Sequence, residues 1–320
     1  MRWKRLFAAL LLLVATPASH ADGLLSIVAG SEARRWEEFQ VKWSDFLNQS
    51  LAAGEERRRL VAAQLILARA DERSGQERQP RHAPSDVDRA KAVRSAVRAG
   101  SHDAVTLTIA AGHCRPPSDE CDRSALAKRA AAADPDNGWL WLQLGGHYGA
   151  AEHDRSERAF MRALSAPRFD DVGFSETIAS LYVPVRRERP DIDPDLALME
   201  LMGLAAAGIT PAPQFVSSMC RQSELARADR ADTCRRLAWS MAHHARTALT
   251  LRIAQAIGQR VGVDGSLMEQ WKARERTVGE ARRTLPPVPT QRAKERAARW
   301  GDDLVTVGEL EAAARLLERP

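Results

Sequence analysis

Histidine, aspartate and glutamate are the residues of this sequence whose types and spacing could support metal binding or catalysis. His243 and His244 are adjacent, so on a helix their side chains point about 100° apart and cannot hold one metal ion as an i, i+4 pair does. The sequence also lacks a G-x-S-x-G nucleophile turn, an H-E-x-x-H metal motif and a glycine-rich phosphate loop. We therefore expect no catalytic residue, no metal ligand and no cofactor.

One stretch leaves an enzymatic alternative open. His147 and His153 lie on either side of a predicted turn, close in sequence to Asp154 and Glu157. These side chains could meet in three dimensions, although their spacing does not fix a third ligand. The alternative is therefore a helical enzyme whose site is non-contiguous, and a deep cleft in which two or more of these four side chains converge would favour it.

Four cysteines form the other chemically distinctive set: Cys114, Cys121, Cys220 and Cys234. An even number of cysteines in an exported chain indicates disulfides, and four cysteines allow three pairings. We expect the local pairing, Cys114 with Cys121 and Cys220 with Cys234, in which each bond joins the end of one helix to the start of the next. A zinc site is disfavoured because no C-x-x-C pair is present.

The first 21 residues have the layout of a secretory signal peptide. A basic start precedes an apolar run over residues 6–14, and small residues stand at Ser19 and Ala21 before the expected cut. The run is too short to span a bilayer, which takes about 20 residues. We expect a mature chain that has no transmembrane segment and is exported to the periplasm, or alternatively secreted. An uncleaved membrane anchor is the competing interpretation.

The charge balance argues against nucleic acid as a partner. The chain of 320 residues carries 47 basic and 42 acidic side chains. Without the three basic residues of the leader, 44 basic side chains oppose 42 acidic ones, which is a net charge of +2. No basic stripe is interleaved with aromatic residues, as nucleic-acid binding would favour.

An aromatic face marks the first predicted helix, which begins at Ser31 as its N-cap and ends before Gly54. Aromatic residues recur at helical spacing on this face, at Trp36, Phe39, Trp43 and Phe46. The face either docks on the protein body, or lies on a membrane surface or on a partner. The mixed charge of the rest of the helix favours docking.

Helical periodicity continues along almost the whole mature chain, so the predicted fold class is all-α. Starts are expected at Asp193–Pro194 and at two capping boxes, Ser266 to Glu269 and Thr306 to Glu309. The nearest approach to a strand, residues 182–185, contains Pro184. The predicted parts are a signal peptide (1–21), a helical hairpin (22–73), a linker (74–86), a helical repeat domain (87–284), and a proline-rich spacer with C-terminal helices (285–320).

The middle of the chain carries a repeat pattern. Its positions are Trp141, Leu144, Gly145 and Tyr148 in one helix and Ser156, Phe160 and Ala163 in the next. This pattern resembles the tetratricopeptide repeat, a helical hairpin of about 34 residues. A weaker unit precedes it, so the resemblance covers about residues 104–167. It implies a solenoid of antiparallel helical hairpins with atypical flanking helices.

The resemblance also implies a function. Members of this family bind segments of other proteins in a groove lined by the first helix of each repeat. In this sequence the groove falls on Trp139, Leu142 and Gln143, although Trp139 could instead belong to the core. We expect an exported, non-enzymatic scaffold or adaptor of the bacterial envelope, whose partner is another envelope protein or a peptide segment. A protein associated with the membrane surface is a further alternative.

Overall fold

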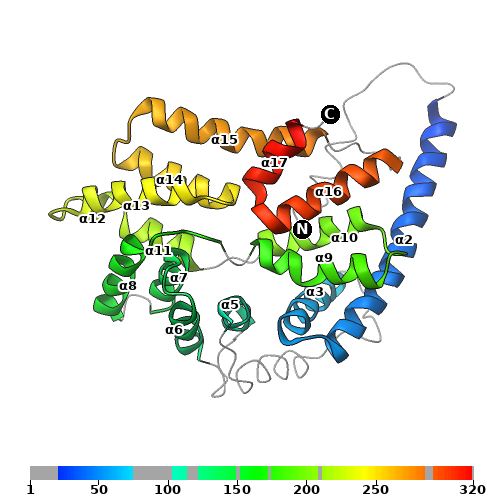
Figure 1. The fold of residues 1–320 in the computed structure, drawn as a ribbon, viewed down its shortest axis with the longest axis horizontal. Coiled ribbons are helices and arrows are strands. Elements are labelled where there is room, and N and C mark those ends of the chain that lie inside the picture. The colour runs from blue at the N-terminus through cyan, green and yellow to red at the C-terminus, as the bar shows by residue number, and fades with distance from the viewer. Residues whose placement is uncertain are drawn as a thin grey trace. The chain divides into compact units, whose positions relative to one another are not determined.

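The computed structural model describes residues 21–74, 103–113, 122–148, 152–171, 174–207, 211–284 and 291–318 (Figure 1). Within these ranges it has fifteen α-helices, one isolated bridge between Asn137 and Arg168, and no strand, which confirms the all-α fold class. The chain divides into two compact units, Met1–Lys42 and Trp43–Pro320. None of the described helices combines the length and apolar character that crossing a membrane requires.

Helix α2 (Ala21–Ala53) runs from the first unit into the second. It already includes Ser31, so the predicted N-cap at this residue is wrong. No proline interrupts residues 21–31, and the glycines there are tolerated within a helix at a cost of about 1 kcal/mol each. The predicted leader falls on residues 1–20, which lie outside the described ones, and on Ala21.

The end of α2 and the start of α3 (Glu56–Ser74) form the predicted turn at Gly54. The Gly54 amide donates to the Ser50 carbonyl at 3.0 Å, and a Cβ atom at Gly54 would collide with that oxygen. The aromatic face is buried from Phe39 onward. The Arg58 guanidinium lies 4.9 Å above the Phe46 ring. A face that is already buried offers little apolar area to a membrane surface.

Four helices follow in the middle of the chain: α5 (Ala104–His113), α6 (Arg123–Ala133), α7 (Gly138–Tyr148) and α8 (His153–Ser165). Each packs against the next in chain order. Asp122 caps α6 by accepting the Ala125 amide at 3.0 Å. The helix predicted from about residue 85 to 99 and most of the predicted linker lie outside the described residues.

A polar clasp closes the α7/α8 hairpin at the start of α7. The buried Asn137 donates to the Asp170 carbonyl and accepts the Asp170 amide, both at 3.1 Å. The Gly138 amide donates to the Arg168 carbonyl at 2.8 Å. The segment after α8 is therefore fixed against the segment before α7.

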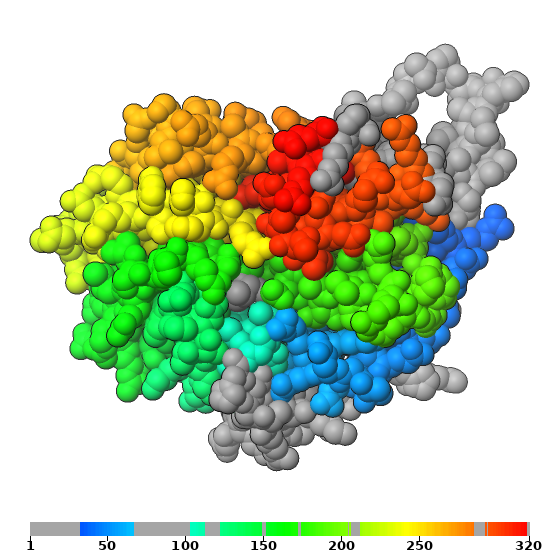
Figure 2. All heavy atoms as spheres, in the orientation of Figure 1, coloured from blue at the N-terminus to red at the C-terminus, as the bar shows by residue number. Residues whose placement is uncertain are grey.

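The next hairpin consists of α9 (Phe174–Glu188) and α10 (Pro194–Ala207), and it contacts both α3 and α16 (Figures 1 and 2). Asp193 caps α10 as predicted, accepting the Asp195 amide at 3.1 Å. Residues 182–185 belong to α9, which contains Pro184 inside the helix. A strand partner for that sequence does not occur among the described residues.

Seven helices complete the chain: α11 (Pro211–Met219), α12 (Gln222–Leu225), α13 (Arg230–His244), α14 (Ala248–Arg260), α15 (Gly265–Thr284), α16 (Gln291–Val307) and α17 (Glu309–Glu318). Helices α13, α14, α15 and α17 pack pairwise in that order, and α17 packs on α16. The predicted spacer falls on residues 285–290, which lie outside the described ones.

Both predicted capping boxes are wrong in their cap residue. Asp264, not Ser266, accepts the first amides of α15, from Ser266 at 2.9 Å and from Leu267 at 3.3 Å. Thr306 belongs to α16, and Gly308, at a φ of 88°, makes the turn into α17. The Glu309 carboxylate instead accepts the Ala248 amide at 2.8 Å, so it caps α14 from a distant part of the chain.

Tyr182 fixes α9 against α16. Its ring lies against Gly301, where a Cβ atom would collide with the phenol, and its hydroxyl donates to the Ala298 carbonyl at 3.4 Å. Arg186 next to it pairs with Asp302 at 2.9 Å. Burial raises the pKa of Tyr182 to about 12, although Arg186 opposes the shift.

This pKa predicts a loss of stability in alkali. The folded state favours the neutral phenol, so the stabilisation is complete below about pH 10 and is lost as the pH rises towards about 12. We expect the free energy of unfolding to fall by about 2–3 kcal/mol over this range. Urea unfolding at about pH 9 and pH 12 measures it, and Tyr182→Phe is the control. Equal pH dependence in the two proteins would contradict the prediction.

Candidate functional site

The predicted groove residues lie inside the protein. Trp139 and Leu142 are completely buried, and Gln143 is 4% exposed. The Trp139 indole nitrogen and the Gln143 amide nitrogen have no hydrogen-bond partner. These three side chains therefore form no accessible surface in this structure, and the burial of Trp139 agrees with the alternative that it belongs to the core.

Gly145, one of the repeat-pattern positions, provides a close approach between helices. The space that a Cβ atom would occupy there is filled by the ring of Phe215 on α11. That ring meets Phe160 edge-on, with 6.3 Å between the centroids. Ser156 on α8 donates to the Gly145 carbonyl at 3.2 Å. Gly145 therefore contacts the second helix of its own hairpin and, in addition, a helix that follows much later in the sequence.

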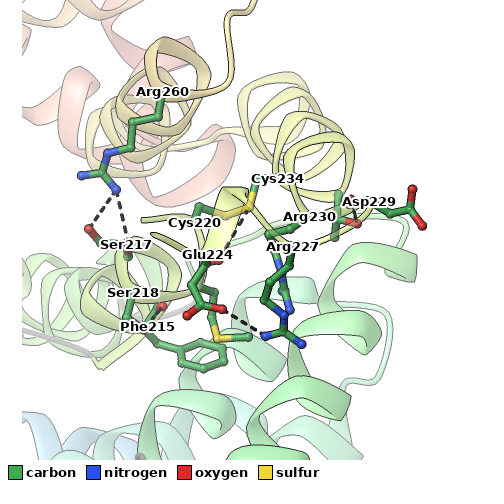
Figure 3. The surroundings of a disulfide bond; sticks show 12 residues. Phe215, Ser217, Ser218, Cys220, Glu224, Arg227, Asp229, Arg230, Cys234 and Arg260 are labelled. Carbon is green, nitrogen blue, oxygen red and sulfur yellow. Dashed lines mark hydrogen bonds and ion pairs between the residues drawn. A yellow bond between two sulfur atoms is a disulfide. The ribbon is translucent and has the colours of Figure 1, made fainter. Parts of the chain in front are cut away.

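Helices α11 and α13, with the short α12 between them, are joined by a disulfide (Figure 3). Cys220 and Cys234 are bonded and completely buried, with 5.9 Å between their Cα atoms. This bond is one of the two pairs predicted from the local spacing. The other predicted pair, Cys114 with Cys121, lies outside the described residues.

A charged cluster joins this disulfide-linked segment to α8. The Glu157 carboxylate on α8 accepts hydrogen bonds from Arg230 and, at 3.0 Å, from Arg227. Arg230 is only 7% exposed, and its guanidinium lies 5.2 Å from the centroid of the Phe160 ring. Arg227 also donates to Glu224 at 3.0 Å (Figure 3). Pairing of this kind is required because a buried, unpaired charge is costly.

Asp229 sets the start of α13 next to this cluster. Its φ of 60° is the one positive value at a described residue other than glycine, and aspartate tolerates this region better than most residues. Its carbonyl accepts a hydrogen bond from the Thr233 amide at 2.9 Å, at the beginning of the helix. In Figure 3 the Asp229 side chain points away from the disulfide, and Arg230 becomes the first residue of α13.

The four residues of the enzymatic alternative converge only in part. The His153 Nε2 atom lies 3.8 Å from a carboxylate oxygen of Glu157, and this carboxylate already pairs with Arg227 and Arg230. An open pocket of about 350 Å³ contains His153 and Asp154 among its lining residues, together with Glu152, Arg155 and Arg158. Burial, assisted by Arg123, lowers the pKa of His147. Within the described ranges no group of three or more potential ligands could hold a metal ion.

The adjacent histidines of α13 meet edge-on, with 4.8 Å between their ring centroids and 86° between the planes. His243 stacks on Trp239, with 5.1 Å between the ring centroids and 5° between the planes. The His244 Nδ1 atom contacts the Ser240 carbonyl at 2.9 Å. Each ring therefore also contacts another residue of its own helix, and the expectation that the pair cannot hold one metal ion stays a prediction.

We expect the Cys220–Cys234 disulfide to contribute strongly to the stability of the fold. On the chain-entropy model, a bond between residues 14 apart in sequence stabilises the fold by roughly 3 kcal/mol. We expect Cys220→Ala with Cys234→Ala to lower the free energy of urea unfolding by about this amount, and dithiothreitol to shift the wild type in the same direction. Any remaining sensitivity of the double variant to dithiothreitol reports the predicted Cys114–Cys121 bond. A wild type that reductant leaves unchanged contradicts the prediction.

The comparisons with known proteins add no assignment, because no family model, curated protein or solved structure matches the chain. The functional interpretation therefore depends on the site itself. What the described residues bring together is a packed stack of helical hairpins, fixed by a buried disulfide and a buried arginine–glutamate contact. The Glu157 carboxylate in this cluster is occupied by arginines.

Proposed function

We propose that this protein is an exported, non-enzymatic interaction scaffold or adaptor of the bacterial cell envelope, built from tetratricopeptide-like helical hairpins. Its partner would be another envelope protein or a peptide segment of one. The proposal combines the repeat pattern of residues 104–167 with the packing of the helices that follow.

The observation that carries the proposal is the contact of α11 with α7 through Phe215 and Gly145. Helix α13 also contacts α8, through the Glu157–Arg230 ion pair. The hairpins α5/α6 and α7/α8 therefore pack in series with α11, although α9 and α10 separate α8 from α11 in sequence. The proposal takes α11, with the disulfide-linked α13, as an atypical third unit. Stable helical solenoids usually need about three or more repeats.

Export is supported by two independent features. The N-terminal residues have the layout of a signal peptide. The Cys220–Cys234 bond suits an oxidising compartment, because structural disulfides are rare in the cytosol. Intact-mass measurement of protein from a periplasmic fraction tests this part. We expect a chain that begins at Asp22, and a full-length chain held in the membrane fraction would indicate an uncleaved anchor.

The scaffold function is tested by affinity capture of the mature, tagged protein from crosslinked host envelopes, read by mass spectrometry. We expect one dominant partner, absent from a capture made with an unrelated exported protein that carries the same tag. Circular dichroism and size-exclusion chromatography establish that the bait is folded and monodisperse. If a folded, monodisperse bait captures no partner, the scaffold proposal is wrong.

A further inference from the structure

The bond between Cys220 and Cys234 is inaccessible in the folded protein. Both cysteines are completely buried. Cys220 directly follows α11, and Cys234 lies near the start of α13 (Figure 3). Thiol–disulfide exchange requires the attacking thiolate to reach a sulfur atom, and cysteines buried in this way are inert. The folded protein therefore protects this bond from reduction, and it would equally protect the two thiols from oxidation.

The segment that carries the bond is docked on the α7/α8 hairpin at two points. Before the bond, Phe215 of α11 lies against Gly145 of α7. Next to the bond, Arg230 stands one turn before Cys234 and donates to Glu157 of α8. Helix α14 packs along α13 as well. The helices that bear the cysteines therefore cannot move apart without breaking contacts to distant parts of the chain.

The timing of folding limits when the bond can form. Helical domains typically fold within milliseconds, whereas disulfide formation takes seconds to hours, depending on the oxidant. A chain that met only a slow oxidant would dock α11 and α13 first and bury both thiols. Before docking, the two cysteines are only 14 residues apart in sequence, and a short loop closes at a small cost in entropy. The bond must therefore form early, and this requires a fast reaction.

We propose that a thiol–disulfide oxidoreductase of the cell envelope forms the Cys220–Cys234 bond before α11 and α13 dock on α7 and α8. One thiolate of the chain attacks the disulfide of the oxidoreductase, which gives a mixed disulfide and releases one oxidoreductase thiolate. The second thiolate attacks the mixed disulfide, so the Cys220–Cys234 bond forms and the other oxidoreductase thiolate leaves. Two electrons pass to the oxidoreductase, and the two thiol protons of the chain end on its thiols.

The inference rests on the export part of the proposed function, and it names a class of enzyme that acts on the chain there. Docking of α11 and α13 is then the step that protects the product of this reaction. The bond in turn holds the start of α13, with Arg230, close to α11 when both helices meet the α7/α8 hairpin.

Protection of the bond is measured on the purified, oxidised mature chain. The variant Cys114→Ala with Cys121→Ala leaves one bond to follow. We expect dithiothreitol to reduce it at least about a hundredfold more slowly in native buffer than in concentrated urea, because fewer than about one molecule in a thousand of a stable protein is unfolded. Alkylation with iodoacetamide followed by intact-mass measurement counts the thiols.

Oxidised glutathione in the same samples is the control, because its exposed bond should be reduced quickly in both solvents. Circular dichroism establishes that the variant is folded. If it is not, the wild type is used and peptide mapping follows the same bond. Equal rates of reduction in the two solvents would overturn the proposal.

The order of the two steps is tested from the reduced side. The same variant is reduced in urea and then given oxidised glutathione, either in urea or after dilution into native buffer. We expect oxidation to be at least about tenfold slower after dilution, because the docked thiols are inaccessible. A reduced chain that stays unfolded after dilution also supports the order, since the bond then precedes docking. A reduced chain that folds and is oxidised as fast as in urea would overturn it.

The oxidoreductase is tested in the host with a chain that keeps only Cys220, through Cys114→Ala, Cys121→Ala and Cys234→Ala. This chain can form the mixed disulfide but cannot resolve it. We expect a disulfide-linked complex that dithiothreitol separates, whose second component is an envelope protein with a reactive pair of cysteines. A chain without cysteines is the control. Recovery of only free thiol or of a glutathione adduct would overturn the assignment to an oxidoreductase.

These outcomes can be told apart from failure of the proposed function. A chain that stays in the cytoplasm with reduced thiols would overturn export, and the oxidoreductase with it. An exported, oxidised chain that traps no protein would overturn the oxidoreductase alone. The envelope capture of a scaffold partner uses the folded wild type, so its result does not depend on either.

Discussion

Replacing Glu157 with alanine is expected to destabilise the second unit by about 3–5 kcal/mol, the range seen when one partner of a buried ion pair is removed. The reason is Arg230, which is 7% exposed and donates to this carboxylate. Without Glu157 its charge stays buried above the Phe160 ring with no carboxylate in contact. Urea unfolding followed by far-ultraviolet circular dichroism measures the loss.

The control is Glu224→Ala, which removes the same charge from the same cluster. Glu224 contacts Arg221 and Arg227, both of which are exposed, so its removal should change stability little. A second test replaces both partners of this ion pair, Glu157→Leu with Arg230→Met. Because no charge is then left unpaired, much of the lost stability should return. If Glu157→Ala and Glu224→Ala have equal effects, the buried contact does not hold the hairpins together.

The local part of the fold is what the sequence made predictable. Helices follow from apolar periodicity, which depends only on neighbouring residues. The stop at Gly54 and the cap at Asp193 were also predictable, because each depends on side chains within a few residues. The Cys220–Cys234 bond belongs to the same class, since it closes a short loop.

The contacts that build the candidate site were not predictable, because they join distant parts of the chain. Gly145 was identified only as a position of the local repeat pattern, yet Phe215 of α11 fills the space beside it, across the intervening α9 and α10. Glu309 caps α14 rather than its own helix for the same reason. The sequence carried no signal for the burial of Arg230. This residue lies in an arginine-rich stretch, in which no local feature separates a buried arginine from the exposed ones.

The exposed side of α13, at Arg236, Trp239 and His243, was marked in the sequence only by a pair of adjacent histidines. The sequence gives no means to decide which side of an amphipathic helix a tryptophan occupies when alanine, leucine and methionine surround it. Burial had to be known before Trp239 could be separated from Trp139. The two residues therefore offer a direct test of the structural assignment.

Trp139→Ala is expected to lower the free energy of unfolding by about 3–5 kcal/mol, as for other large aromatic residues removed from a core. The side chain is completely buried, so its loss leaves a cavity inside the stack of hairpins. Trp239→Ala is the matched control, because it makes the same substitution at an exposed site and should change stability by no more than about 0.5 kcal/mol.

The same pair of variants separates a core role from a groove role for Trp139. If Trp139 forms the core, Trp139→Phe should retain most of the stability, because it keeps an aromatic ring and removes an indole nitrogen that has no hydrogen-bond partner. If Trp139 instead lines a groove that opens for a partner, Trp139→Ala should leave stability near that of the wild type and abolish partner capture. The core assignment therefore requires the free energy of unfolding to respond to substitution at position 139.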